Sequence, residues 1–272
     1  MSQFYLISGA NSGIGRALAE ELIQKGHHVF ATAPTEEGRQ TLAGISDRLI
    51  PLLLDIRRQE HIEQLKKSVL QYTDHLDGLI NNAGMGVGGP VELLDIEVVR
   101  NVFEINVFGH LNMTQTFLPL LRKAKRGRII FTGSVAGFLA FPLQSPYSAS
   151  KFALKAFCEA LRLELKPQKI HVSLIQPGAI KTPIWLTSPF EGVENHPEID
   201  RYHLAMKKGN TFFQQAAMSA SPISIVVKAM NHALFSRFPK ASYLVGFDAY
   251  LAYSSKVLPS FIFDFILIRI FL

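Results

Sequence analysis

Three polar side chains near the middle of the chain have the types and spacing needed to move a proton. Tyr147 and Lys151 are four residues apart in a segment with helical periodicity, so both project from one face of a helix. A tyrosine ordinarily titrates near about pH 10, and a neighbouring ammonium group lowers that pKa. Ser134 ends a predicted strand and would hydrogen-bond a substrate oxygen on which negative charge develops. A Tyr-x-x-x-Lys pair alone also fits an ordinary surface helix, so the surrounding elements decide between the two interpretations.

A glycine-rich turn near the N-terminus has the composition of a phosphate-binding loop. Residues 8–15 read Ser-Gly-Ala-Asn-Ser-Gly-Ile-Gly, directly after a predicted strand and at the start of a predicted helix. Backbone N–H groups at a helix N-terminus, with no Cβ atoms in the way, suit the pyrophosphate of a dinucleotide. A glycine turn that only reverses the chain is the alternative interpretation. The position between strand and helix favours the phosphate site.

The end of the second predicted strand bears on which dinucleotide is bound. An acidic residue about 20 residues past the glycines would bind the ribose 2′-hydroxyl and repel a 2′-phosphate. This segment has no acid before Glu36, and Thr32 and Thr35 are able to donate hydrogen bonds to a phosphate. The missing acid slightly favours NADP(H) over NAD(H). An arginine directly after the strand would have favoured it more, but Arg39 lies further downstream.

Apolar runs of strand length alternate with amphipathic stretches of helix length along the chain. The strand candidates are Phe4–Ser8, His28–Thr32, Leu49–Leu54, Gly78–Asn81, Arg128–Thr132, His171–Gln176 and Tyr243–Val245. The helix candidates are Gly13–Lys25, Gln59–Tyr72, Glu97–Arg122, Tyr147–Lys166 and Ser221–Ser236. Near-continuous apolar strands and strict alternation predict an α/β fold: a Rossmann-like, doubly wound parallel sheet of about seven strands with helices on both faces. Residues 1–272 would form a single domain.

Two further polar segments follow strands of this predicted sheet. Asn81-Asn82-Ala83-Gly84 ends the fourth strand, and residues 177–182, Pro-Gly-Ala-Ile-Lys-Thr, follow the sixth. Each alone is turn chemistry. Together with the glycine turn and Ser134 they place small and polar residues at the carboxyl edge of the sheet, where ligands of open α/β folds bind.

These motifs, in this order, resemble the single-domain short-chain dehydrogenase/reductase family over nearly the whole chain. The resemblance implies a nicotinamide dinucleotide cofactor and a proton relay. The implied catalytic residues are Asn106, Ser134, Tyr147 and Lys151. The implied cofactor-binding residues are Gly9, Asn11, Ser12, Gly13, Ile14, Gly15, Thr32, Asp55, Ile56, Asn82, Ala83, Gly84, Tyr147, Lys151, Pro177, Gly178, Ile180 and Thr182. In the family, the counterpart of Asp55 contacts adenine, and that of Asn106 helps to order a water-linked relay to the lysine.

The sequence indicates the substrate less specifically than it indicates the cofactor and the catalytic residues. Residues 33–38 and 241–249 resemble the retinol and hydroxysteroid dehydrogenase group, which implies interconversion of a lipophilic alcohol with its ketone or aldehyde. The segment from Pro183 to Gln215 lacks clear periodicity, and we interpret it as an irregular lobe that caps the substrate. Its candidate pocket residues are Ile184, Trp185, Leu186, Phe190, Phe212 and Phe213. Two alternatives stay open: a carbonyl reductase of small non-lipid substrates, and a dinucleotide-binding regulatory protein without turnover.

Composition sets the remaining expectations. The net charge of +6 fits an anionic partner or a solvated basic face, but residues 122–126 are explained by a helix C-terminus, so nucleic acid is not expected. The single cysteine, Cys158, fits a reducing, cytoplasmic compartment, and the histidines show no metal-ligand spacing, so no metal is expected. The hydrophobic tail at about residues 257–272 packs on its own chain, on a partner subunit or on a membrane. A homodimer or homotetramer is expected, with residues 97–122 as one candidate interface.

Overall fold

The computed structural model describes residues 2–182, 190, 193 and 195–271. Its seven strands form one sheet in the order β3-β2-β1-β4-β5-β6-β7. Their bounds are β1 Phe4–Ile7, β2 His28–Ala33, β3 Leu49–Leu53, β4 Gly78–Asn81, β5 Arg128–Thr132, β6 His171–Pro177 and β7 Ser242–Val245. Every pairing between neighbouring strands is parallel. The predicted Rossmann-like sheet is therefore confirmed, with strand bounds that differ from the prediction by a residue or less.

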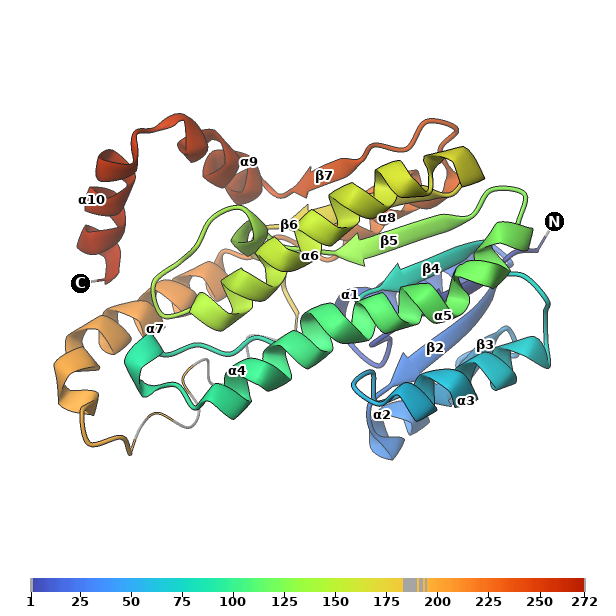
Figure 1. Ribbon diagram of the computed structural model, residues 1–272, viewed down its shortest axis with the longest axis horizontal. Coiled ribbons are helices and arrows are strands. Elements are labelled where there is room, and N and C mark those ends of the chain that lie inside the picture. Colours follow the sequence, from blue (N-terminus) through green and yellow to red (C-terminus); the bar gives the residue numbers. More distant parts are fainter. Residues whose placement is uncertain (1, 183–189, 191–192, 194, 272) are drawn as a thin grey trace.

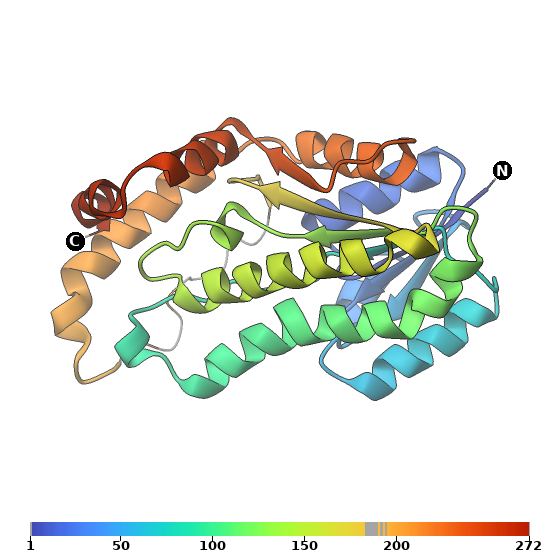
Figure 2. The same ribbon diagram turned by 45° about the horizontal axis from the view of Figure 1, so that its top comes forward.

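Helices cover both faces of the sheet (Figures 1 and 2). The helices of the sheet layers are α1 Gly13–Gln24, α2 Glu36–Gln40, α3 Gln59–Leu70, α4 Ile96–Phe103, α5 Gly109–Lys123, α6 Ser145–Glu164 and α8 Ser224–Phe235. One apolar core joins α1 and α8 to the strands, and a second joins α3, α5 and α6 to the opposite face. Because consecutive strands carry side chains to both cores, the strands are apolar throughout, as the sequence indicated.

The order of the strands reverses beside β1, since β2 lies on one side of it and β4 on the other. Ile7 of β1 pairs with Ala31 of β2 and with Ile80 of β4. Such a reversal leaves a crevice at the carboxyl ends of the strands, because the following connections run to opposite faces. In Figure 1 these ends point toward the part of the molecule that carries α7 (His203–Met218), α9 (Phe247–Ser254) and α10 (Ser260–Phe271).

The helix expected over Glu97–Arg122 is not regular, which corrects the prediction. A π-helical turn, η2, occupies Glu104–Phe108 between α4 and α5. Gly109 follows it, and a Cβ there would lie 2.7 Å from Ile56 Cγ1 and 3.0 Å from Glu104 O. The widened turn brings Asn106 into the interior with no exposed surface. Such π-turns inside α-helices are frequent at functional sites.

The lobe is more regular than expected in the part that the structure describes. A 3-10 turn, η6 (Ile199–Tyr202), leads into α7, so the interpretation of residues 183–215 as wholly irregular is wrong. The periodicity of α7 is weak because it buries only a narrow apolar strip, Ala205, Gly209 and Phe213. Ile184, Trp185 and Leu186 lie outside the described residues.

In the structure the C-terminal tail begins earlier than predicted, at Phe247: it folds back as two helices, α9 and α10, joined by the 3-10 turn η7 (Ser255–Val257). Phe271 of α10 is fully buried, and its ring centroid lies 4.9 Å from that of Phe212 on α7. Figures 1 and 2 both place α10 beside α7. One face of the tail therefore packs on its own chain. Among the residues that the structure describes, no helix combines the length and apolar character needed to cross a bilayer.

Candidate active site

Four expected catalytic side chains are carried by three elements that meet at the carboxyl edge of the sheet. Ser134 follows β5, Asn106 lies in η2, and Tyr147 and Lys151 lie one turn apart near the start of α6. Ser134 and Tyr147 both line a cavity of about 580 Å³. Lys151 and Asn106 lie behind them in the interior, where they are 4% and 0% exposed.

The side chains of Tyr147 and Ser134 face the same cavity. Burial raises the pKa of Tyr147, and the polar side chain of Ser134 opposes the rise in part. Ser134 Oγ accepts a hydrogen bond from Ala136 N at 3.1 Å, which fixes the serine side chain. The protein alone therefore keeps the phenol protonated, ready to act as a donor.

Lys151 is a buried cation with a fixed position. Its Nζ donates to Thr132 O at 2.9 Å and lies 5.7 Å from the centroid of the Tyr147 ring. Burial lowers the pKa of Lys151 to about 8. An ammonium held in this position would stabilise a phenolate on Tyr147, because attraction between opposite charges is strong where water is excluded.

Asn106 joins the turn after β4 to α6. Its Oδ1 accepts from Met85 N at 3.0 Å, while its Nδ2 donates to Met85 O at 2.9 Å and to Ser150 Oγ at 3.0 Å. Ser150 Oγ donates in turn to Tyr147 O at 2.7 Å. The amide thus uses both its donor and its acceptor to set the position of the helix that carries Tyr147 and Lys151.

The glycine turn has the shape that a phosphate-binding loop needs. Gly9 and Gly13 have φ of 64° and 55°, and a Cβ on Gly15 would lie 2.4 Å from Gly9 O. Ser12 at the N-cap of α1 makes no side-chain capping hydrogen bond. The first N–H groups of α1 have no intrahelical partners and are oriented to bind an anion.

Ser8 and Asn82 fasten this turn to the end of β4. Ser8 Oγ accepts hydrogen bonds from Asn82 N at 2.9 Å and from Ala83 N at 3.0 Å. Asn82 Nδ2 donates to Gly9 O at 3.0 Å, and Thr132 Oγ1 donates to Asn82 Oδ1 at 3.2 Å. The segment 81–84 and the glycine turn therefore form one rigid unit.

The segment after β2 carries an acidic and a basic side chain, which pair with each other near the edge of the sheet. Thr32 is buried, and its Oγ1 accepts from Gly9 N at 3.3 Å, so it supports the glycine turn from below. Thr35 caps α2 by accepting from Gly38 N at 3.2 Å. Arg39 Nη2 and Glu36 Oε1 form an exposed ion pair at 2.5 Å.

Asp55 follows β3 at the same edge. Its carboxylate accepts from Arg57 Nη2 at 2.7 Å, and this pairing lowers the pKa of Asp55. Ile56, the residue after it, is 5% exposed, and the predicted contact of both residues with the cofactor stays a prediction. The left-handed backbone of the glycine turn, the open start of α1 and the buried ammonium of Lys151 all fit a nicotinamide dinucleotide.

Apolar side chains from the lobe line the far side of the cavity. Phe212 and Phe213 of α7 line it as expected, together with Phe141 from the loop before α6. Phe190 is 2% exposed and packs in the cluster behind this wall. Gly178, Ile180 and Thr182, from the segment after β6, line the same cavity as Tyr147.

The sequence analysis missed two polar residues of this region. Asp248, in the first turn of α9, lines the cavity, although its segment was singled out for resemblance alone. His110 is fully buried beside the relay, and its Nε2 hydrogen-bonds Ala83 O at 2.8 Å. Burial lowers the pKa of His110 to about 3, with a further lowering from the charge of Lys151. The sequence signal that could have identified His110 is its spacing of four residues, one helical turn, from Asn106.

Among the described residues, no three or more histidine, cysteine, aspartate or glutamate side chains are grouped in a way that would hold a metal ion.

Residues 3–189 match the model of the short chain dehydrogenase family, so the chain belongs to that family of oxidoreductases. It is an enzyme that acts on CH–OH groups with a nicotinamide dinucleotide. Two curated relatives match almost the whole chain. Dehydrogenase/reductase SDR family member 9 of Bos taurus is 35% identical over 98% of this chain and 88% of its own. 17-beta-hydroxysteroid dehydrogenase type 6 of Bos taurus is 33% identical over the same shares.

Solved structures agree with the fold and with the cofactor class. A short-chain dehydrogenase from Streptomyces avermitilis superposes with a TM-score of 0.82 at 29% identity, covering 94% of this chain and 92% of its own. An enzyme from Burkholderia phymatum, solved with NAD, gives 0.80 at 25% identity over 94% and 92%. Another from Burkholderia cenocepacia, solved with NADP, gives 0.75 at 25% identity over 98% and 97%.

Proposed function

We propose that this enzyme interconverts a lipophilic alcohol and its ketone or aldehyde, with Tyr147 as the proton donor and acceptor. One observation carries the proposal: a single cavity is lined both by the polar side chains of Ser134 and Tyr147 and by the aromatic side chains of Phe141, Phe212 and Phe213. The polar side chains can hold a reacting oxygen, and the aromatic side chains can hold an apolar body. The relatives named for a steroid substrate support this substrate class.

In this mechanism, the bound cofactor supplies or accepts the hydride, and the protein sets positions and charges. In the reductive direction, Ser134 Oγ donates a hydrogen bond to the substrate oxygen and Tyr147 delivers its proton to it. The ammonium of Lys151 stabilises the phenolate that remains. In the oxidative direction, the phenolate takes the proton from the alcohol, and the ammonium of Lys151 favours the formation of that phenolate beforehand.

The decisive experiment compares wild type with Tyr147→Phe on a panel of lipophilic alcohols and ketones, while cofactor binding is titrated separately. Loss of turnover with retained binding is the expected result. Equal rates in the two proteins would refute the role of Tyr147. Binding of cofactor by wild type without turnover of any substrate in the panel would instead favour a regulatory dinucleotide-binding protein. Turnover restricted to small polar carbonyls would favour a non-lipid carbonyl reductase.

We also propose that NADP(H) is preferred slightly over NAD(H). The end of β2 carries no acid before Glu36, and Glu36 is already paired with Arg39. A 2′-phosphate near α2 would compete for that guanidinium. Arg39→Ala should weaken binding of NADPH and leave binding of NADH unchanged. Tighter binding of NADH than of NADPH by wild type would overturn this preference.

A homo-oligomer would form through the face that carries η2 and α6, because large apolar side chains are exposed on both elements. Phe152 and Phe157 of α6 are each 43% exposed, and Phe108, the last residue of η2, is 47% exposed. Light scattering of wild type and of Phe157→Glu measures this directly. A monomeric wild type would exclude the oligomer.

The outer face of the tail would contact a membrane surface. Phe247 of α9, Val257 of η7 and Phe261 of α10 are 83%, 85% and 71% exposed, and Lys256 and Arg269 lie in the same segment. Exposed apolar side chains next to cations are typical of segments that lie in the headgroup region of anionic lipids. Phe261→Ser should reduce co-sedimentation with anionic vesicles, whereas Tyr72→Ser, an exposed aromatic after α3, should not. Wild type that stays in the supernatant would rule the contact out.

A further inference from the structure

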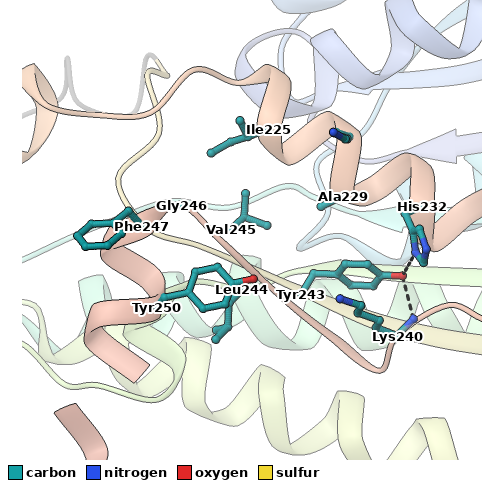
Figure 3. Close-up of a pocket in the computed structure, with 11 residues that line it drawn as sticks. Ile225, Ala229, His232, Lys240, Tyr243, Leu244, Val245, Gly246, Phe247 and Tyr250 are labelled. Carbon is teal, nitrogen blue, oxygen red and sulfur yellow. Dashed lines mark hydrogen bonds between the residues drawn. The ribbon is translucent and has the colours of Figure 1, made fainter. Parts of the chain in front are cut away.

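The carboxylate of Asp248 connects the C-terminal part of the chain to the segment after β6. Asp248 lies in the first turn of α9, directly after the turn that ends β7. Its Oδ2 accepts a hydrogen bond from Ala179 N at 2.6 Å. A charged acceptor makes this bond stronger than one between neutral groups. Figure 3 shows the turn at Gly246 and Phe247 through which β7 enters α9.

Two glycines leave the space that this carboxylate occupies. A Cβ added to Gly178 would lie 2.1 Å from Asp248 Oδ2, and one added to Gly246 would lie 2.5 Å from Asp248 Oδ1. Gly246 also has φ of 103°, which few other residues adopt. The carboxylate is therefore seated against the backbone of both strand ends, and neither glycine can gain a side chain without displacing it.

The same segment is held on its other side by Ser221. Ser221 N donates to Ala179 O at 2.9 Å, and Lys181 N donates to Ser221 O at 3.0 Å. Gly178 N donates to Val245 O at 2.9 Å. The backbone at residues 178–181 thus has three supports: Val245 at the end of β7, Ser221 in the loop before α8, and the carboxylate of Asp248 on α9.

This segment faces the reacting groups, because Gly178, Ile180 and Thr182 line the same cavity as Tyr147. Among the described residues that line this cavity, Asp248 carries the only charge. The hollow drawn in Figure 3 is lined by residues of α8, β7 and the start of α9, and Ser134, Tyr147 and Asp248 are not among them. Asp248 therefore lies just after the carboxyl end of β7, beside the cavity that contains Ser134 and Tyr147.

We infer that Asp248 is a positioning residue for the nicotinamide half of the cofactor. It acts through residues 178–182, by holding the Ala179 N–H so that this backbone forms a fixed wall beside the ring. The inference rests on the proposed dinucleotide site. It assigns to α9 a part in cofactor binding that differs from that of the glycine turn, which is the proposed site of the pyrophosphate.

The test separates the two halves of the cofactor by isothermal titration. Each protein is titrated with the nicotinamide dinucleotide that wild type binds more tightly and with the matching ADP-ribose or its 2′-phosphate, which lacks the nicotinamide. Asp248→Ala should weaken binding of the dinucleotide about tenfold, as expected for loss of one charge-assisted hydrogen bond, and leave ADP-ribose within about twofold. Asp248→Asn keeps an acceptor and should recover most of the lost affinity. Asp264→Ala on α10 is the matched control and should bind both ligands as wild type does.

Hydrogen exchange gives an independent measurement on the protein without ligand. The amide of Ala179 should exchange faster in Asp248→Ala than in wild type, whereas amides of β1 should be unchanged. If Asp248→Ala lost the same affinity for both ligands, or lost none for either, the inference would be overturned. An unchanged exchange rate at the amide of Ala179 would also overturn it. A wild type that binds neither ligand would refute the proposed cofactor site itself. If Asp248→Ala fails to fold, Asp248→Asn and Asp248→Ser are titrated in its place, with the larger loss expected for serine because it cannot reach Ala179 N.

Discussion

Asn106 Nδ2 donates a hydrogen bond of 3.0 Å to Ser150 Oγ, so a buried amide in a π-turn is joined to the residue beside Lys151. Since Ser150 Oγ also donates to Tyr147 O, the register of α6 at the active site depends on this contact. The π-turn and the catalytic helix therefore form one mechanical unit.

Replacing Asn106 tests that relationship. Asn106→Ala leaves the backbone N–H and C=O of Met85 without their side-chain partner, and each unsatisfied buried group costs about 1–3 kcal/mol. We expect a lower free energy of unfolding and a larger loss in kcat than in cofactor affinity. Urea unfolding and steady-state kinetics measure these. Asn112→Ala on α5 is the control, and a variant that keeps full kcat would contradict the positioning role.

The pH dependence of alcohol oxidation tests the partnership of Tyr147 and Lys151. Burial raises the pKa of Tyr147, so the phenolate that oxidation needs forms only as the pH rises, and the ammonium of Lys151 favours it. Lys151 itself has its pKa lowered to about 8, so the free enzyme loses that ammonium above this pH. We expect kcat/KM for oxidation to increase with pH on its acid limb and Lys151→Met to move that limb to higher pH. An unmoved limb in Lys151→Met would show that the ammonium has no such effect.

His110 makes stability depend on pH. Its pKa is about 3 in the folded protein and 6.5 without burial, so between these values the unfolded chain binds the additional proton. Stability from this group is full above pH 6.5 and is lost as the pH falls toward 3, with a slope of about 1 kcal/mol per pH unit.

The measurement is chemical unfolding at about pH 5 and pH 7.5 for wild type and His110→Gln. The glutamine cannot take up the proton, so the difference between the two pH values should shrink. His203→Gln, at the exposed start of α7, is the control. The same pH difference in wild type and His110→Gln would exclude His110 as its source.

Phe271 lies behind the apolar wall of the cavity and should tune its shape. Its ring contacts Phe212 and lies 6.2 Å from the centroid of Phe213, both of which line the cavity. Truncation of a buried phenylalanine costs about 3–5 kcal/mol at a core position, and less where neighbours can relax. Phe271→Ala should raise KM for bulky apolar substrates with little change in cofactor affinity. Phe265→Ala, 58% exposed on the same helix, should leave KM unchanged. Equal KM values in Phe271→Ala and wild type would show that the tail does not shape the pocket.

Local sequence determined much of this protein. The apolar strands, the glycine turn and the four-residue spacing of Tyr147 and Lys151 depend on neighbours in the chain. Their periodicity and composition therefore predicted the strands of a parallel sheet and the helix that carries the reactive pair. Lys151 on α6 and Ser134 after β5 lie where those patterns placed them.

Tertiary structure decided what depends on contacts between distant segments. The π-turn at Glu104–Phe108 breaks a helix whose sequence shows continuous periodicity, and it does so where Gly109 packs against Ile56. The regular helix α7 buries too narrow a strip to show a pattern, and the carboxylate of Asp248 meets Ala179 only after β6 and β7 pair. Such contacts leave no local signal, because the residues that create them are tens of positions apart in the chain and become neighbours only when the sheet is formed.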